Sequence, residues 1–99
     1  MDAFKNISLD DAKTLINTGN IIIADIRDPD SFKSGHIQGA VHLSNDNLQD
    51  FIRDSDLDTP VIVCCYHGHS SQPAAQFLSE QGFDTVYSLI GGYTAWSAE

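Results

Sequence analysis

Cys65 is the residue of this sequence whose surroundings are best suited to covalent chemistry. It follows an apolar run at residues 61–64, which predicts a buried strand, and it precedes a segment with Pro73 near its start, which predicts a helix. The unpaired N–H groups and the dipole of a helix N-terminus stabilise a nearby negative charge. We therefore expect the thiol of Cys65 to have a lowered pKa and to be largely ionised.

Residues 65–70 are expected to form a loop between this strand and this helix. They are Cys65, Tyr66, His67, Gly68, His69 and Ser70. Gly68 permits backbone angles closed to other residues, so successive N–H groups can turn inward as an anion-binding nest, which suits a charged sulfur intermediate such as a persulfide. We expect the side-chain oxygen of Ser70 or Ser71 to cap the helix. The alternative is that Cys65 is a buried structural cysteine at the end of a core strand.

Strands and helices alternate along the sequence. Apolar runs predict strands at residues 21–25, 41–43, 61–64 and 86–88, and capping residues, prolines and glycines predict helices at 8–19, 28–35, 45–53, 71–82 and from 91 onwards. This alternation predicts a doubly wound α/β fold, in which helices flank a central parallel sheet and ligands bind at the carboxyl ends of the strands. Asp25 and Arg27 follow one long strand as Cys65 follows the other, although sequence order alone does not make them neighbours.

The two cysteines, Cys64 and Cys65, are adjacent. A disulfide between neighbouring residues is strained and closes no useful loop, so we expect two free thiols in a reducing compartment. Because side chains alternate along a strand, Cys64 is assigned to the core and Cys65 to the mouth of the loop. We expect no metal, because His67 and His69 have no second pair of ligands at a recognisable spacing, and we expect no cofactor.

Length and charge exclude several classes of protein. Ninety-nine residues are expected to form one domain, residues 1–99. Fourteen acidic against five basic side chains give a net charge of −9, which disfavours nucleic-acid binding. No apolar segment approaches the roughly 20 residues of a membrane span, and the N-terminus lacks the features of a signal peptide. We expect a cytoplasmic protein with neither a nucleic acid nor a membrane as partner.

Three groups of residues resemble the rhodanese family of sulfurtransferases. The N-terminal group is Asp25-Ile26-Arg27, Phe32, Gly35-His36-Ile37 and Gly39-Ala40, and the C-terminal group is Gly82-Phe83, Val86-Tyr87, Gly91-Gly92-Tyr93 and Trp96. Between them, residues 65–70 match the six-residue active-site loop of the sulfurtransferase members. The resemblance covers nearly the whole chain, with the motifs in the family's order and spacing.

The resemblance implies a ping-pong transfer of sulfur. The Cys65 thiolate would take the outer sulfur of a donor such as thiosulfate, release sulfite and hold a persulfide, which cyanide or a small thiol would then discharge. Backbone amides from Tyr66 to Ser71 would cradle the persulfide, with the Ser70 and Ser71 hydroxyls as additional donors. Asp25 and Arg27 would tie the loop to the sheet. Thioredoxin-like dithiol proteins are among the sulfur acceptors that the family implies.

Two positions of the loop region depart from the family pattern. Residue 69 is His where related loops often have Asn, and residue 72 is Gln where a Lys would add positive charge beside the sulfur. The loop therefore has no fixed cation. This predicts a weak affinity for thiosulfate that improves as His67 and His69 gain protons towards about pH 6.

Two other functions are weighed against sulfur transfer. Cysteine phosphatases and arsenate reductases of related fold use a Cys-x5-Arg loop, but residue 71 is Ser, so an oxyanion would lack a guanidinium clamp. The second alternative is a non-catalytic rhodanese-like module that binds a partner or carries sulfur to it. Cys65 argues against an inert module, although a persulfide carrier would need the same cysteine.

Overall fold

A parallel sheet forms the centre of the molecule. The structure, a computed structural model, describes residues 4–98. It contains a five-stranded sheet in the order β1-β5-β4-β2-β3, in which all neighbouring strands are parallel. The strands are β1 (Lys5–Ile7), β2 (Ile22–Asp25), β3 (Val41–His42), β4 (Val61–Cys64) and β5 (Val86–Leu89). The predicted doubly wound α/β fold is confirmed.

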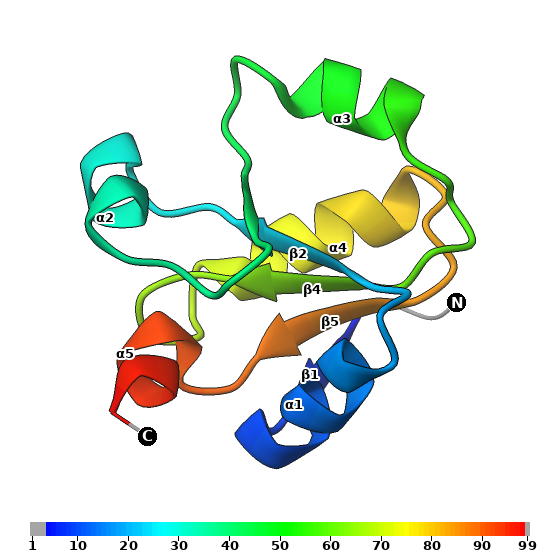
Figure 1. Ribbon diagram of the computed structural model, residues 1–99. Coiled ribbons are helices and arrows are strands. Elements are labelled where there is room, and N and C mark those ends of the chain that lie inside the picture. The colour runs from blue at the N-terminus through cyan, green and yellow to red at the C-terminus, as the bar shows by residue number, and fades with distance from the viewer. Residues whose placement is uncertain (1–3, 99) are drawn as a thin grey trace.

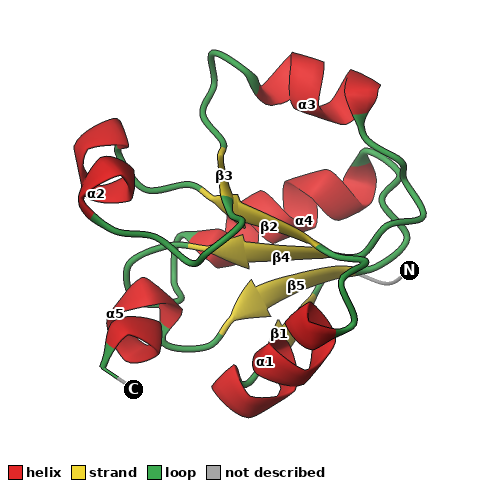
Figure 2. Cartoon of the chain, in the orientation of Figure 1, coloured by secondary structure: helices red, strands yellow, loops and turns green. Residues whose placement is uncertain are grey.

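Helices cover both faces of this sheet. They are α1 (Leu9–Asn17), α2 (Pro29–Ser34), α3 (Leu48–Asp54), α4 (Ser71–Glu80) and α5 (Gly92–Ser97). Apolar residues of α3 and α4 pack on one face, and those of α1 and α5 pack on the other (Figure 1). Figure 2 shows the arrowheads of β4 and β5 pointing towards the side on which α2 and α5 lie. The carboxyl ends of the central strands are thus enclosed by helices.

The central strand β4 is buried on both faces. Val61 and Val63 pack with residues of α3 and α4, whereas Ile62 and Cys64 pack with residues of α1 and α5. None of these four side chains is more than 1% exposed. The uninterrupted apolar run therefore has the explanation expected for a parallel sheet covered by helices on both faces.

Two helix starts follow the predicted capping chemistry. The Ser8 hydroxyl accepts a hydrogen bond from the Asp11 N–H (3.1 Å) at the start of α1. The Asp28 carboxylate accepts one from the Ser31 N–H (3.1 Å) at the start of α2. Each cap satisfies one N–H group that has no partner within its helix.

Two elements differ from the prediction. Strand β1 was not expected, because only Ile7 of its three residues is buried and the segment contains no apolar run. Helix α3 begins at Leu48 rather than near residue 45. The side chain of Asn47 holds the preceding residues in a turn, since its Oδ1 accepts from the Ser44 N–H and its Nδ2 donates to the His42 carbonyl, both at 2.8 Å.

Two features are absent from residues 4–98. No helix in this range is long and apolar enough to cross a membrane. The same range contains no cluster of three or more His, Cys, Asp or Glu side chains that could hold a metal ion.

Candidate active site

The sulfur of Cys65 lies inside a ring of hydrogen-bond donors. The backbone N–H groups of Gly68 and Ser71 point at Cys65 Sγ from 3.1 Å and 3.2 Å, and Ser71 Oγ lies 3.2 Å from the same atom. Cys65 is only 3% exposed, so the assignment of its side chain to the mouth of the loop was wrong. The side chain lies on the floor of the loop because residues 66–71 fold over it. We call Cys65 Sγ and these three donors the sulfur cradle.

The cradle favours the thiolate form of Cys65. Burial alone would raise the pKa of this thiol, but hydrogen bonds from the Ser71 hydroxyl and from the N–H groups of Ser71, Gly68 and His67 outweigh burial and lower it. Donors that point at a charged sulfur stabilise the ionised form. The expected lowered pKa thus has a structural cause in the loop and in the first turn of α4.

Gly68 has the backbone conformation on which the cradle depends. Its φ is +91°, a left-handed value that residues with a Cβ rarely adopt. A Cβ at this position would lie 2.8 Å from the Gly91 nitrogen and 3.1 Å from the Leu89 carbonyl oxygen. Residue 68 must therefore be glycine, both for its backbone angles and for the close approach of the loop to residues 89–91.

Helix α5 fixes the beginning of the loop from the other side. The N–H of Tyr93 donates to the Cys65 carbonyl at 2.7 Å, and the N–H of Thr94 donates to the Tyr66 carbonyl at 3.0 Å. Gly92 makes this approach possible, since a Cβ on it would lie 2.5 Å from the Cys65 carbonyl oxygen. The first N–H groups of α5, which have no partner within the helix, are thus satisfied by the loop.

The predicted cap of α4 was wrong. The helix begins at Ser71, but the Ser70 side chain makes no capping hydrogen bond, and Ser71 Oγ lies between Cys65 Sγ and Ser88 Oγ (2.7 Å). The hydroxyl that could have capped the helix is directed at the sulfur instead. Gln72, just inside the helix, donates from Nε2 to the Gly68 carbonyl at 2.8 Å and so braces the loop from above.

The outer side chains of the loop do not reach the sulfur. His67, His69 and Ser70 are exposed. Tyr66 is 43% exposed, and its hydroxyl contacts the Asp28 carboxylate and Ser31 Oγ (2.6 Å) at the start of α2. Tyr66 therefore fastens the loop to α2 rather than donating to the sulfur.

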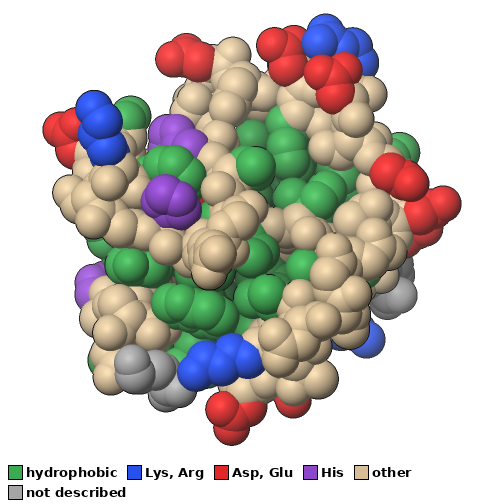
Figure 3. All heavy atoms as spheres, in the orientation of Figure 1, with side chains coloured by type: hydrophobic (Ala, Val, Ile, Leu, Met, Phe, Trp, Pro, Cys, Tyr) green, Lys and Arg blue, Asp and Glu red, His purple; other side chains and the backbone are tan. Residues whose placement is uncertain are grey.

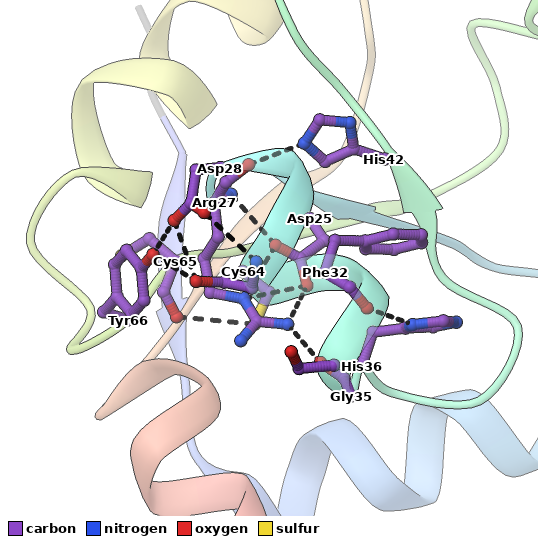
Figure 4. A network of polar contacts seen from close by, with 12 residues as sticks. Asp25, Arg27, Asp28, Phe32, Gly35, His36, His42, Cys64, Cys65 and Tyr66 are labelled. Carbon is purple, nitrogen blue, oxygen red and sulfur yellow. Dashed lines mark hydrogen bonds and ion pairs between the residues drawn. The ribbon is translucent and has the colours of Figure 1, made fainter.

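Asp25 and Arg27 form a buried ion pair behind the loop (Figure 4). Arg27 Nη2 lies 2.8 Å from Asp25 Oδ2 and also donates to the Gly35 carbonyl at 2.6 Å. The guanidinium lies 4.1 Å from the ring centre of Tyr93 and 5.8 Å from that of Tyr66. The pair thus links the end of β2 to the end of α2. The Arg27 guanidinium also contacts the loop through the ring of Tyr66 and α5 through the ring of Tyr93. Removing one partner would leave a buried charge, which typically costs about 3–5 kcal/mol.

A hollow of about 580 Å³ lies beside the cradle rather than over it. Its apolar lining includes Leu43, Leu48 and Phe77, and Figure 3 shows hydrophobic side chains exposed beneath α3 in this region. Asp28, which contacts Tyr66, also lines it, whereas Cys65 does not.

Comparison with known proteins identifies the family. The model of the rhodanese-like domain matches residues 8–99. The chain belongs to the rhodanese-like family. It is 51% identical over 96 residues to the thiosulfate sulfurtransferase GlpE of Pseudoalteromonas translucida (strain TAC 125), covering 97% of this chain and 91% of that protein. It is 52% identical to the thiosulfate sulfurtransferase GlpE of Shewanella oneidensis, covering 97% of this chain and 95% of the relative.

The fold is shared with rhodanese-like proteins of lower identity. The human single-domain sulfurtransferase TSTD1 superposes with a TM-score of 0.84 at 18% identity, covering 95% of this chain and 96% of that one. At this identity the likeness concerns the fold alone.

Ser88 was missed by reasoning from the sequence. It lies in β5 and is fully buried, and its hydroxyl contacts Ser71 Oγ behind the sulfur. A serine inside an otherwise apolar strand, between Tyr87 and Leu89, is the signal that could have drawn attention to it. A buried hydroxyl needs a partner, and here the partner belongs to the sulfur cradle.

Proposed function

We propose that this protein is a thiosulfate sulfurtransferase, in which Cys65 carries the transferred sulfur as a persulfide. The observation that carries the proposal is the sulfur cradle: one thiol with a lowered pKa and three converging donors. Family membership and about 50% identity to two proteins named as thiosulfate sulfurtransferases support it.

In the first half of the reaction the Cys65 thiolate attacks the outer sulfur of thiosulfate. A new S–S bond forms to Cys65 Sγ while the bond between the two sulfurs of thiosulfate breaks, and sulfite leaves with the electron pair of that bond. The product is a persulfide whose negative charge lies on the outer sulfur. The cradle lowers the pKa of Cys65 and so favours the thiolate that makes this attack.

In the second half a nucleophilic acceptor removes the outer sulfur. Cyanide attacks it with its carbon lone pair, thiocyanate forms, and Cys65 leaves as the thiolate that began the cycle. The N–H groups of Gly68 and Ser71 stabilise that leaving thiolate, so the same donors serve both half-reactions. Small thiols and thioredoxin-like dithiol proteins are proposed as further acceptors, and the two free thiols suit a cytoplasmic location.

The loop is poorly suited to phosphoryl or arsenate chemistry. Residue 71 provides a hydroxyl to the sulfur where a Cys-x5-Arg loop would provide a guanidinium. Arg27 cannot replace it, because its Nε and Nη2 hydrogen bonds go to Asp25 and to the Gly35 carbonyl.

The test combines turnover with the intact mass of the protein. Incubation with thiosulfate should add one sulfur atom, about 32 Da, and addition of cyanide should remove it with formation of thiocyanate. Cys65→Ser should lose both the mass gain and turnover. Cys64→Ala is the matched control, since it removes the neighbouring thiol and should keep both. Sulfur uptake by Cys65→Ser, or no uptake by the unaltered protein, would contradict the proposal.

A further inference from the structure

Ser88 is a polar residue in the middle of the apolar sheet. Its side chain is 0% exposed, and it is paired in register with Val63 of β4. The Ser88 hydroxyl lies 2.7 Å from Ser71 Oγ. This is its only side-chain hydrogen bond within residues 4–98, where no buried side-chain nitrogen or oxygen lacks a partner.

The ionisation of Cys65 determines the direction of this hydrogen-bond chain. A thiolate has no proton, so Ser71 must donate its hydroxyl proton to Cys65 Sγ, 3.2 Å away. Ser71 Oγ then accepts, and Ser88 must donate to it. A neutral thiol does not impose this direction: Cys65 can donate to Ser71 and Ser71 to Ser88, which leaves the Ser88 proton without another side-chain partner among residues 4–98. The negative charge of the thiolate thus favours the direction in which Ser88 donates to Ser71 and Ser71 donates to the sulfur.

We propose that Ser88 is a positioning residue that holds the Ser71 hydroxyl as a donor to the Cys65 thiolate. Hydrogen bonds in such a chain polarise one another, so the donation from Ser88 strengthens the donation from Ser71 to the sulfur. The effect is largest for the free thiolate, in which the charge lies on Sγ. The inference deepens the proposed function, and it rests on the thiolate character of Cys65.

The test measures the ionisation of Cys65 without any sulfur donor or acceptor. Alkylation by iodoacetamide, followed from about pH 5 to pH 10 in a Cys64→Ala background, reports the reactivity of the single remaining thiol. Ser88→Ala should move the midpoint of the profile to higher pH and slow alkylation below that midpoint by roughly two- to tenfold, the range expected for one weakened hydrogen bond.

A matched pair separates the hydroxyl from the shape of the side chain. Ser88→Thr and Ser88→Val have nearly the same shape, but only the first keeps a hydroxyl. We expect the threonine variant to react faster than the valine variant below the midpoint, whatever strain the extra methyl group brings to both. Thermal unfolding of each variant shows whether its fold is retained.

The role of Ser71 as intermediary is tested by combining variants. In a Ser71→Ala background the additional change Ser88→Ala should have no further effect on the profile, because Ser88 acts only through Ser71. The inference is overturned if Ser88→Ala has the same profile as its parent, if the threonine and valine variants react alike, or if the effect of Ser88→Ala persists without Ser71. Because alkylation requires no sulfur transfer, these outcomes are independent of whether thiosulfate is the donor.

Discussion

Cys64 and Cys65 are neighbours in the chain, yet they have opposite chemistry. Both are buried, at 0% and 3% exposure. Burial raises the pKa of Cys64 to about 12, with a further contribution from the charge of Asp25 that Arg27 partly offsets. The pKa of Cys65 is lowered despite burial, because the Ser71 hydroxyl and the backbone N–H groups of Ser71 and Gly68 donate to its sulfur.

The comparison shows that hydrogen-bond donors, and not exposure, distinguish the reactive thiol. Cys64 faces α1 and α5 among apolar side chains, and among residues 4–98 the one hydrogen bond of its thiol goes to the Cys65 carbonyl, at 3.6 Å. Cys65 lies one residue further on, where the strand has ended and the loop turns its N–H groups inward. A single residue step along the chain thus moves a thiol from an environment that opposes charge to one that stabilises it.

Gly68→Ala should remove much of this difference, and it has the largest expected effect. A Cβ would meet the Gly91 nitrogen at 2.8 Å, so the loop must move and the N–H of residue 68 must leave the sulfur. Overpacking of this kind costs about 1–3 kcal/mol, in addition to the strain of a positive φ. We expect iodoacetamide alkylation of Cys65 near pH 6 to slow more than tenfold, and the urea midpoint of unfolding to fall.

Gly19→Ala is the control for backbone strain alone. Gly19 also has a positive φ, +83°, but a Cβ on it would have no atom within 4 Å. This variant should lose some stability and keep the reactivity of Cys65. If Gly19→Ala and Gly68→Ala had equal alkylation rates, the N–H of Gly68 would not be a determinant of the thiolate.

The sequence correctly predicted that Cys65 lies between a strand and a helix, but it did not predict which groups contact its side chain. Three local features of the sequence indicated the elements around Cys65. The apolar run before it indicated a buried strand, Gly68 indicated a loop with unusual backbone angles, and Pro73 indicated the start of a helix. The direction of the Ser71 hydroxyl depends on Ser88, which is 17 residues away in sequence. Capping by Ser70 or Ser71 was a sound local expectation that a tertiary contact overrode.

The burial of Cys65 could not be predicted for a related reason. Strand alternation describes the side chain only as far as the strand extends, and β4 ends at Cys64. The hydrogen bonds from Tyr93 and Thr94 that fix residues 65 and 66 come from α5, more than 25 residues later in the chain. Likewise, β1 is an edge strand whose pairing with β5 supplies the evidence that its own three residues lack.

At alkaline pH, the fall of the free energy of unfolding with rising pH should depend on Cys64 and not on Cys65. The pKa of Cys64 is raised from 9.0 to about 12 in the folded protein, so from pH 9 upwards the unfolded chain loses this proton while the folded one keeps it. Stability then falls as pH rises, by at most about 1.4 kcal/mol per pH unit. Cys65, whose pKa is lowered, has the opposite sign: its contribution is present at alkaline pH and is lost as pH falls through its folded pKa.

Urea unfolding between pH 8 and pH 11 can separate these two contributions. Above about pH 10, Cys64→Ala should flatten the decline relative to the unaltered protein, whereas Cys65→Ala should leave that slope in place, because the contribution of Cys65 no longer changes once the unfolded thiol is ionised. All ionisable groups other than the two thiols are common to the three proteins. An unchanged slope in Cys64→Ala would mean that Cys64 ionises as easily in the folded protein as in the unfolded chain.

Gln72→Lys should have the smallest effect, because it adds charge beside the cradle without changing the donors. Gln72 braces the Gly68 carbonyl (2.8 Å), a contact that a lysine ammonium can also make. The added cation should lower the KM for thiosulfate by roughly two- to fivefold, as expected for a partly exposed ion pair, and the gain should shrink at high salt. Gln72→Met removes the brace without adding charge, so the difference between the two variants isolates the electrostatic contribution. If the lysine variant had the KM of the methionine variant at low salt, the backbone donors alone would determine thiosulfate affinity, and the neutral loop would not limit binding.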